Sequence, residues 1–208
     1  MRIVEIKGNA DMRVIGMTLA HKVNDQLRCA IVTDDIAYSR IGEKISDRIY
    51  RCGEIYVAIV PELFCINELD KAKMLIDVAI EDIKKTTGEE SEVVLVCWNN
   101  ELVTDYELKT AVALFKEGMS TRDVTEYNWV KTDSEETDYD TLRYVVFYDK
   151  KKYKNVNYEH SEKVLVTDAE TKSIREMEQT GRFKAISGGY SAIANDIAGK
   201  KCGVYTGK

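Results

Sequence analysis

A short glycine-containing segment near the N-terminus is the first candidate for binding chemistry. Residues 7–13 read Lys-Gly-Asn-Ala-Asp-Met-Arg and stand between a predicted strand and a predicted helix. A helix N-terminus offers free N–H groups and the positive end of the helix dipole, and both favour a phosphate group. The candidate binding residues of this segment are Gly8, Asn9, Asp11 and Arg13. The same segment can also be an ordinary strand-to-helix turn.

The segment lacks the pattern of a working phosphate-binding loop. That pattern needs a second glycine, followed by lysine and then serine or threonine. Met12 and Arg13 stand about where the lysine and the hydroxyl residue would be, and Gly16 lies too deep in the predicted helix to help. The sequence therefore requires no cofactor, although a modified loop of this kind could hold a nucleotide.

Two adjacent carboxylates follow the second predicted strand. Asp34 and Asp35 come directly after the run Cys-Ala-Ile-Val-Thr. Ligands of open α/β sheets bind beyond the carboxyl ends of the strands, so this pair could order a magnesium-bound water or meet a ribose hydroxyl. Either residue could instead cap a turn or the next helix. Asp34 and Asp35 are therefore kept as candidate binding residues with a structural alternative.

Other catalytic constellations are not indicated. The chain has two histidines, and neither lies near a serine in a G-x-S-x-G turn. The five cysteines form no C-x-x-C pair, and four of them lie in or near apolar runs, as buried thiols in a reducing compartment do. We assign no catalytic residue and no metal ligand, and the sequence favours a protein that is not an enzyme.

The composition excludes a disordered chain. Of the 208 residues, 44% are hydrophobic, which is enough to build a core. The chain carries 30 Lys+Arg against 36 Asp+Glu, and this acidic balance argues against a nucleic-acid partner. There is no signal-peptide pattern and no apolar run close to the roughly 18 residues of a membrane span. We therefore expect a cytoplasmic protein without a membrane span.

Short β-branched runs alternate with amphipathic stretches in the first half of the chain. This alternation is typical of βαβ units, which give a mainly parallel sheet with helices on both faces. We therefore predict a three-layer α/β fold of the Rossmann-like or P-loop-like class. The expected strands are residues 2–7, 28–33, 55–60 and 92–97, and the expected helices are residues 11–25, 39–50, 67–85 and 106–116.

The pattern changes after Gly118. An acidic stretch at residues 132–140 and a lysine cluster at 150–154 are expected to be solvated. Further strands are predicted at 142–148 and 163–166, and further helices at 169–179 and 190–198. The absence of a linker favours one domain over residues 1–208, with a smaller C-terminal subdomain from about 141–208 as the alternative.

Three segments follow one another in an order that suggests a family. Lys7-Gly8 after the first strand, residues 30–35 ending in aspartates, and residues 53–63 with the helix that follows them carry the likeness. Over about residues 1–118 the chain resembles the MinD/ParA-type P-loop ATPases, particularly their pilus-assembly localisation branch. It lacks the complete lysine pair, the hydroxyl magnesium ligand and the Walker B aspartate of that family. The resemblance therefore implies a degenerate relative that has lost ATP hydrolysis and keeps dimerisation or partner binding.

Four apolar residues are the candidate interface. Met12 stands near the start of the first helix, and Leu63, Phe64 and Ile66 follow Pro61 in an expected loop. An exposed apolar patch marks an interface, although the three loop residues could also fold back into the core. We therefore expect a non-catalytic interaction or scaffold protein that acts through self-association or a protein partner. The alternative is an active nucleotide- or phosphate-dependent enzyme with a non-standard glycine loop.

Overall fold

A computed structural model provides the fold. It describes residues 1–8, 11–66, 68–97, 127–133, 141–148, 183–186 and 189–199, together with positions 169, 172 and 176. The strands are β1 (Arg2–Gly8), β2 (Cys29–Thr33), β3 (Glu43–Lys44), β4 (Ile49–Cys52), β5 (Ile55–Ile59), β6 (Val93–Cys97), β7 (Tyr127–Asp133), β8 (Thr141–Tyr148) and β9 (Phe183–Ile186). The helices are α1 (Met12–Asn24), α2 (Leu69–Thr87) and α5 (Gly189–Ile197), with short 3₁₀ helices η1 (Ile36–Arg40) and η2 (Pro61–Cys65).

The described strands form one mixed, mostly parallel sheet of an α/β fold. Its nine strands lie in the order β3-β4-β5-β2-β6-β1-β8-β7-β9. The five strands from β5 to β8 in that order are parallel, whereas β3, β4, β7 and β9 pair antiparallel at the two edges. The four strands predicted in the first half of the chain therefore lie in one sheet and are parallel, which confirms that prediction.

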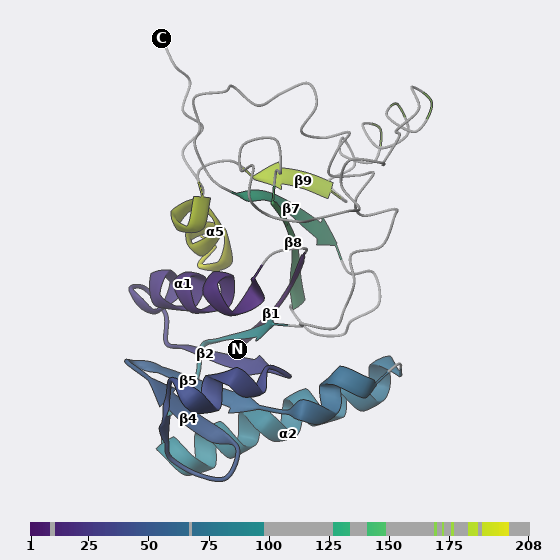
Figure 1. The fold of residues 1–208 in the computed structure, drawn as a ribbon. Helices are drawn as coiled ribbons and strands as arrows, with labels where there is room; N and C mark the ends of the chain where they lie inside the picture. The colour runs from purple at the N-terminus through teal and green to yellow at the C-terminus, as the bar shows by residue number, and fades with distance from the viewer. Residues whose placement is uncertain are drawn as a thin grey trace.

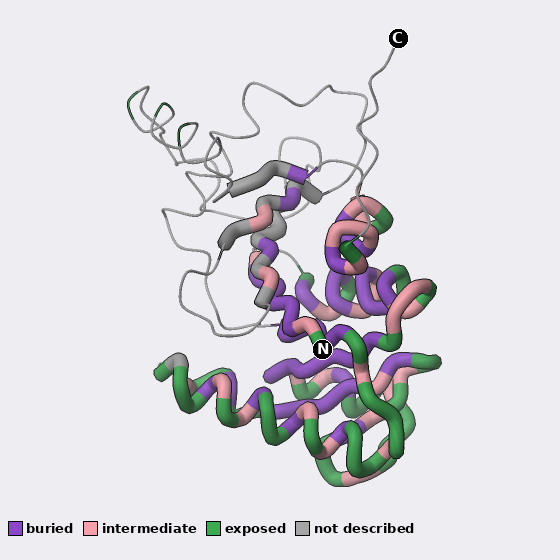
Figure 2. Tube along the Cα trace, turned by 180° about the vertical axis from the view of Figure 1, so that it is seen from behind, coloured by how far each residue is buried: buried purple, intermediate pink, exposed green. Residues whose placement is uncertain are grey.

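The central strands are buried on both faces, and their side chains alternate between two core clusters. Ile31 of β2 and Leu95 of β6 pack in one cluster with residues of α1 and α5. Val32 and Val96, the next residues along, pack in the other cluster with residues of α2. Figure 1 shows α1 and α5 on one side of β2 and β5 and α2 on the other, and in Figure 2 these strands form the buried centre. Continuous apolar runs are what such strands require.

The two long helices have ends that their sequences explain. The Asp11 side chain caps the first turn of α1, as N-cap aspartates do. Gly88 ends α2 in the left-handed conformation with φ 72°, which glycine adopts without strain. The prediction of a helix over residues 67–85 is confirmed by α2. Of the helices that the structure describes, none combines the length and the apolar character needed to cross a bilayer.

The helix predicted over residues 39–50 is wrong. Only η1 is helical there, and the chain then forms the β3–β4 hairpin, whose second strand pairs antiparallel with β5. The hairpin buries Ile49 opposite Ala58 on the α2 side of the sheet. Gly42 permits the close return of the chain, because a Cβ at this position would lie 2.8 Å from the Cys52 Sγ. Tertiary pairing with β5 therefore replaces the local helical pattern.

Part of the second half continues the same sheet. β8 pairs in parallel with β1, and β7 and β9 extend the edge beyond it. Strand β8 and helix α5 confirm the predictions for residues 142–148 and 190–198, whereas β7 and β9 were not predicted. Asp196 of α5 accepts hydrogen bonds from Lys131 and Tyr144, which fastens this helix to the sheet. The elements predicted at 106–116 and 163–166, the lysine cluster and most of 134–140 and 169–179 lie outside the described residues.

Candidate functional site

The carboxyl ends of β1, β2 and β6 meet at one edge of the sheet, where α1 begins. This edge is where a parallel α/β sheet places its ligands. Gly8 ends β1, Asp34 and Asp35 follow β2, and Asp11 and Arg13 stand at the start of α1. The sheet thus brings the two predicted loops together, although they are more than twenty residues apart in sequence. Asn9, the remaining candidate, lies outside the described residues.

The first turn of α1 is occupied by the chain's own carboxylate. The Asp11 Oδ1 accepts hydrogen bonds from the backbone N–H groups of Arg13 at 3.0 Å and Val14 at 3.3 Å. These are the N–H groups that a phosphate at this helix start would use. A bound anion would have to displace a group of the same charge. The geometry therefore favours the ordinary capped turn over a phosphate-binding loop.

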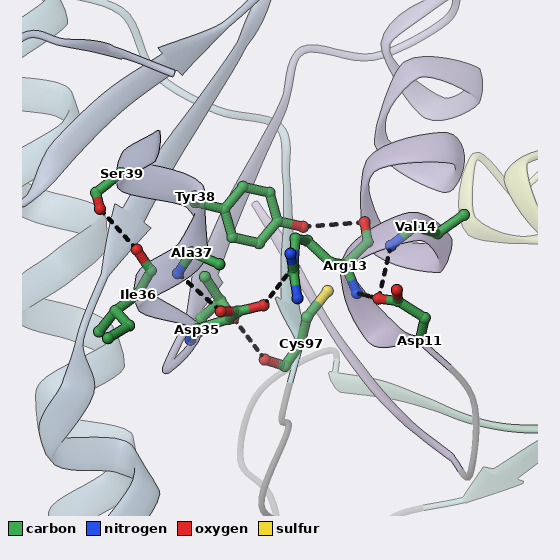
Figure 3. Close-up of polar contacts among 10 residues, drawn as sticks. Asp11, Arg13, Val14, Asp35, Ile36, Ala37, Tyr38, Ser39 and Cys97 are labelled. Carbon is green, nitrogen blue, oxygen red and sulfur yellow. Dashed lines mark hydrogen bonds and ion pairs between the residues drawn. The ribbon is translucent and has the colours of Figure 1, made fainter. Parts of the chain in front are cut away.

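An ion pair joins the two loops across the edge. The Arg13 Nε donates to the Asp35 Oδ2 at 2.7 Å, and this hydrogen bond raises the pKa of Arg13. The other oxygen of Asp35 accepts from the backbone N–H of Ala37 at 2.8 Å and caps η1. Figure 3 shows both oxygens of Asp35 engaged in this way. Asp35 thus has the capping role that the sequence left open, and it also fixes Arg13.

A buried tyrosine completes the closure. Tyr38 has no solvent exposure, and its hydroxyl donates to the Arg13 backbone carbonyl at 3.1 Å. Burial raises the pKa of the Tyr38 phenol, so it stays neutral and can keep donating. On the neighbouring strands, the Thr33 hydroxyl donates to the Cys97 carbonyl at 3.0 Å. These groups fill the α1 side of the edge with satisfied hydrogen bonds.

Helix α1 comes very close to β6 at Gly16. A Cβ built at this position would lie 2.6 Å from the Cys97 Sγ, so only glycine fits without a shift. Burial raises the pKa of the Cys97 thiol to about 12, and the negative charge of Asp34 contributes to the rise. A thiol this hard to ionise is a poor nucleophile. The residue therefore serves packing, and the sequence pattern did not reveal the role of Gly16.

Two further charged residues are buried at this edge. Lys7 at the end of β1 is 4% exposed, and Asp34 after β2 is 6% exposed. Charged side chains are seldom this deeply buried, so both help to define the site. Within the described part of the chain, no three histidine, cysteine or carboxylate groups gather as metal ligands would.

The four predicted interface residues divide between core and surface. Met12 and Leu63 are 3% and 2% exposed and pack in the two core clusters, so their expected place on an interface is corrected. Phe64 is 52% exposed, and Ile66 is half-buried against the core. The five residues of η2 turn Leu63 inward and Phe64 outward. Of the four, Phe64 is therefore the one whose side chain is presented to solvent.

An open hollow of about 480 Å³ lies beside η2 at the same end of the sheet. Its volume is within the range of small-molecule and peptide side-chain pockets. Arg48 and Glu62 form an ion pair at its rim, with the Arg48 Nη2 and the Glu62 Oε1 2.7 Å apart. Side chains that repeat every three residues eclipse one another in a 3₁₀ helix, so Phe64 stands on the side of η2 where Pro61 lines the hollow. The lining residues are Ile36, Ser39, Asp47, Arg48, Tyr50, Ile59, Pro61 and Glu62.

Sequence reasoning missed this hollow. Several of its residues belong to the segment that was expected to be helical, and a helix would have scattered them. The one available signal is Pro61 directly after an apolar strand, which marks the turn into η2. Comparison with protein-family models finds no match, and comparisons with curated proteins and with solved structures find none.

The contact between Gly16 and Cys97 gives a stability prediction. Alanine normally stabilises a helix interior by about 1 kcal/mol relative to glycine. Here we expect Gly16→Ala to lower the free energy of unfolding by about 1–3 kcal/mol, because the new Cβ would overlap the Cys97 sulfur. In a Cys97→Ala background the nearest remaining side-chain atoms lie at 3.6 Å, so the same change should cost little or stabilise. Urea denaturation of the four proteins measures the difference, and an equal cost in both backgrounds would contradict this packing.

The cysteines give a reactivity prediction. Cys65 is exposed, whereas Cys97 is buried with a pKa of about 12. With iodoacetamide at pH 8 we expect Cys65 to be alkylated readily and Cys97 to stay unmodified until the protein unfolds, because the thiolate is the reacting form. Peptide-level mass spectrometry with and without urea separates the two sites. Equal alkylation in the folded protein would show that the edge around Cys97 is open.

Proposed function

We propose that this chain is a non-catalytic α/β interaction or scaffold protein. The observation that carries the proposal is the closure of the carboxyl edge by the protein's own groups. Asp11 occupies the first N–H groups of α1, and Arg13 is held by Asp35. The polar groups that would meet a nucleotide in an active enzyme therefore already have partners inside the chain. In this reading the edge is a stable surface and not an empty active site.

The neighbouring surface supports the interaction part of the proposal. Ile36 is 62% exposed at the hollow, and Phe64 stands next to it on η2. Apolar anchors beside a concave surface with a polar rim are the usual features of a protein-binding patch. Arg48 and Glu62 would form that rim, and the partner would insert an apolar side chain into the hollow. A protein or peptide segment fits this surface better than a highly charged nucleotide does.

The finer classification belongs to the same proposal. The parallel strands with helices on both faces are compatible with a three-layer, Rossmann-like or P-loop-like class. A degenerate nucleotide site and descent from the MinD/ParA-type ATPases would follow from the resemblance described above. On that reading, Lys7, Asp34 and the α1 N-terminus are remnants of a site whose chemistry has been replaced by internal contacts.

The first test concerns nucleotide. We expect no ATP turnover by the wild-type protein and no saturable ATP binding in the millimolar range, because Asp11 holds the N–H groups of α1. Phosphoryl transfer also needs a positioned cation to stabilise developing charge. Coupled-enzyme assays and isothermal titration calorimetry with magnesium and ATP measure both quantities.

An informative variant for this test is Asp11→Ser. Serine keeps the helix cap but removes the negative charge, so the variant should remain folded. Anion binding that appears only in Asp11→Ser would support the internal replacement of a phosphate. Wild-type turnover that vanishes in Asp34→Ala would overturn the proposal in favour of the enzyme.

The second test compares two adjacent residues of η2. We expect Phe64→Asp to leave the melting temperature within a few degrees of wild type, because this side chain is largely exposed. Leu63→Asp should unfold the protein, since it places a charge in the α2-side core. A photo-reactive residue at position 64 should crosslink to a protein in cells that make this chain naturally. The same probe at Val14, which is exposed on α1, is the matched control.

The outcome of the crosslinking decides the role of the surface. Adducts from position 64 that are absent from position 14 would support a partner at the hollow. Equal labelling from both positions, or no protein adduct from either, would contradict a docking role for this edge.

A further inference from the structure

The solvent side of α2 carries a regular stripe of side chains. Its residues are Lys71, Met74, Val78, Glu81 and Lys85. They recur at alternating intervals of three and four residues, the spacing of the contact positions in a coiled coil. The buried side chains of the helix, Ala72, Ile76, Ala79 and Ile83, form the opposite stripe and pack in the α2-side core. Helix α2 is therefore two-sided, with one stripe in the core and one in solvent.

The centre of the outer stripe is apolar and exposed. Met74 is 60% exposed and Val78 is 52% exposed. Single exposed apolar residues are common, but these two are one helical turn apart and so form a continuous contact surface. In Figure 2 this side of α2 runs along the outside of the molecule, away from the buried strands.

Charged residues flank the apolar centre in an order that is complementary to itself. Lys71 precedes Met74 by three residues, and Glu81 follows Val78 by three. When two copies of this helix pack antiparallel, Met74 of each copy lies opposite Val78 of the other. The same register puts Lys71 of each copy opposite Glu81 of the other, so attractive charge pairs border the apolar layers on both sides.

A parallel arrangement would be unfavourable. It would place Lys71 against Lys71 and Glu81 against Glu81, and like charges at such positions oppose pairing. The existing ion pairs do not prevent the antiparallel arrangement. Lys71 bonds Glu68 at 2.8 Å and Lys85 lies 3.7 Å from Glu81, but all these side chains are more than half exposed. Exposed ion pairs contribute little to stability and exchange partners easily.

We propose that α2 pairs antiparallel with α2 of a second copy of this chain, through the stripe from Lys71 to Lys85. The inference rests on the proposed interaction function and names one partner for it, on a surface separate from the hollow beside η2. A helix of 19 residues is about 28 Å long, so the contact is limited to one helix pair. Contacts of this size are weak and reversible, and the dimer should form in the micromolar range or above.

Charge reversal tests this arrangement sharply. Lys71→Glu places two glutamates opposite each other at both ends of the pair, and Glu81→Lys places two lysines there. We expect each single variant to raise the dimer dissociation constant about tenfold or more. A mixture of the two variants should form a heterodimer, because every glutamate of one chain then faces a lysine of the other. Sedimentation equilibrium and native mass spectrometry measure the homodimers and the heterodimer.

The matched control is Lys73→Glu. It makes the same charge change on the same helix, but position 73 lies off the stripe and should leave the dissociation constant unchanged. The double variant Lys71→Glu, Glu81→Lys should dimerise like wild type. Rescue between two chains cannot arise from lost contacts within one chain, so it separates pairing from a purely structural role.

Three results would overturn the inference. These are a monomeric wild type at high micromolar concentration, a dimer unaffected by either reversal, and the absence of a heterodimer in the mixture. None of them bears on nucleotide turnover or on crosslinking from position 64. Failure of the α2 pair and failure of the proposed interaction function are therefore distinguishable.

Discussion

The closed carboxyl edge depends on the close approach of α1 to β6 at Gly16. Because no side chain stands between Gly16 and Cys97, the first turns of α1 lie low over the ends of the parallel strands. That position brings the Arg13 carbonyl within reach of the Tyr38 hydroxyl and the Arg13 guanidinium within reach of Asp35. A larger residue at position 16 would lift the helix and separate these groups. One missing methyl group therefore underlies the polar network that closes the site.

The parts of the fold that could be predicted are those whose sequence pattern matches their burial. Residues 93–97 form a continuous apolar run because β6 is covered on both faces, and α2 has a wide apolar stripe because one side packs on the sheet. The β3–β4 hairpin could not be predicted in the same way. It depends on pairing with β5 and on the space at Gly42, and neither is visible in the local pattern.

The site followed from sequence only in part. Asp34 and Asp35 were expected at a strand end, and Asp35 as a cap, because carboxylates are common in both places. The ion pair between Asp35 and Arg13 could not be foreseen, since it joins residues on two loops that only the parallel strand order brings together. Leu63 and Phe64 show the same limit at closer range. They are adjacent and similarly apolar, and only the geometry of η2 puts one in the core and the other in solvent.

The two proposed surfaces have a definite relation in space. Helix α2 follows η2, so its N-terminus lies near the carboxyl edge, while the apolar centre of its outer stripe lies two turns further along. An antiparallel pair of α2 helices would point the carboxyl edges of the two copies in opposite directions. Each copy would keep its own hollow beside η2 accessible. A partner with two binding segments would then gain from the raised effective concentration of the second site, even if each contact alone were weak. Self-pairing through α2 and docking at the edge therefore reinforce each other and do not compete.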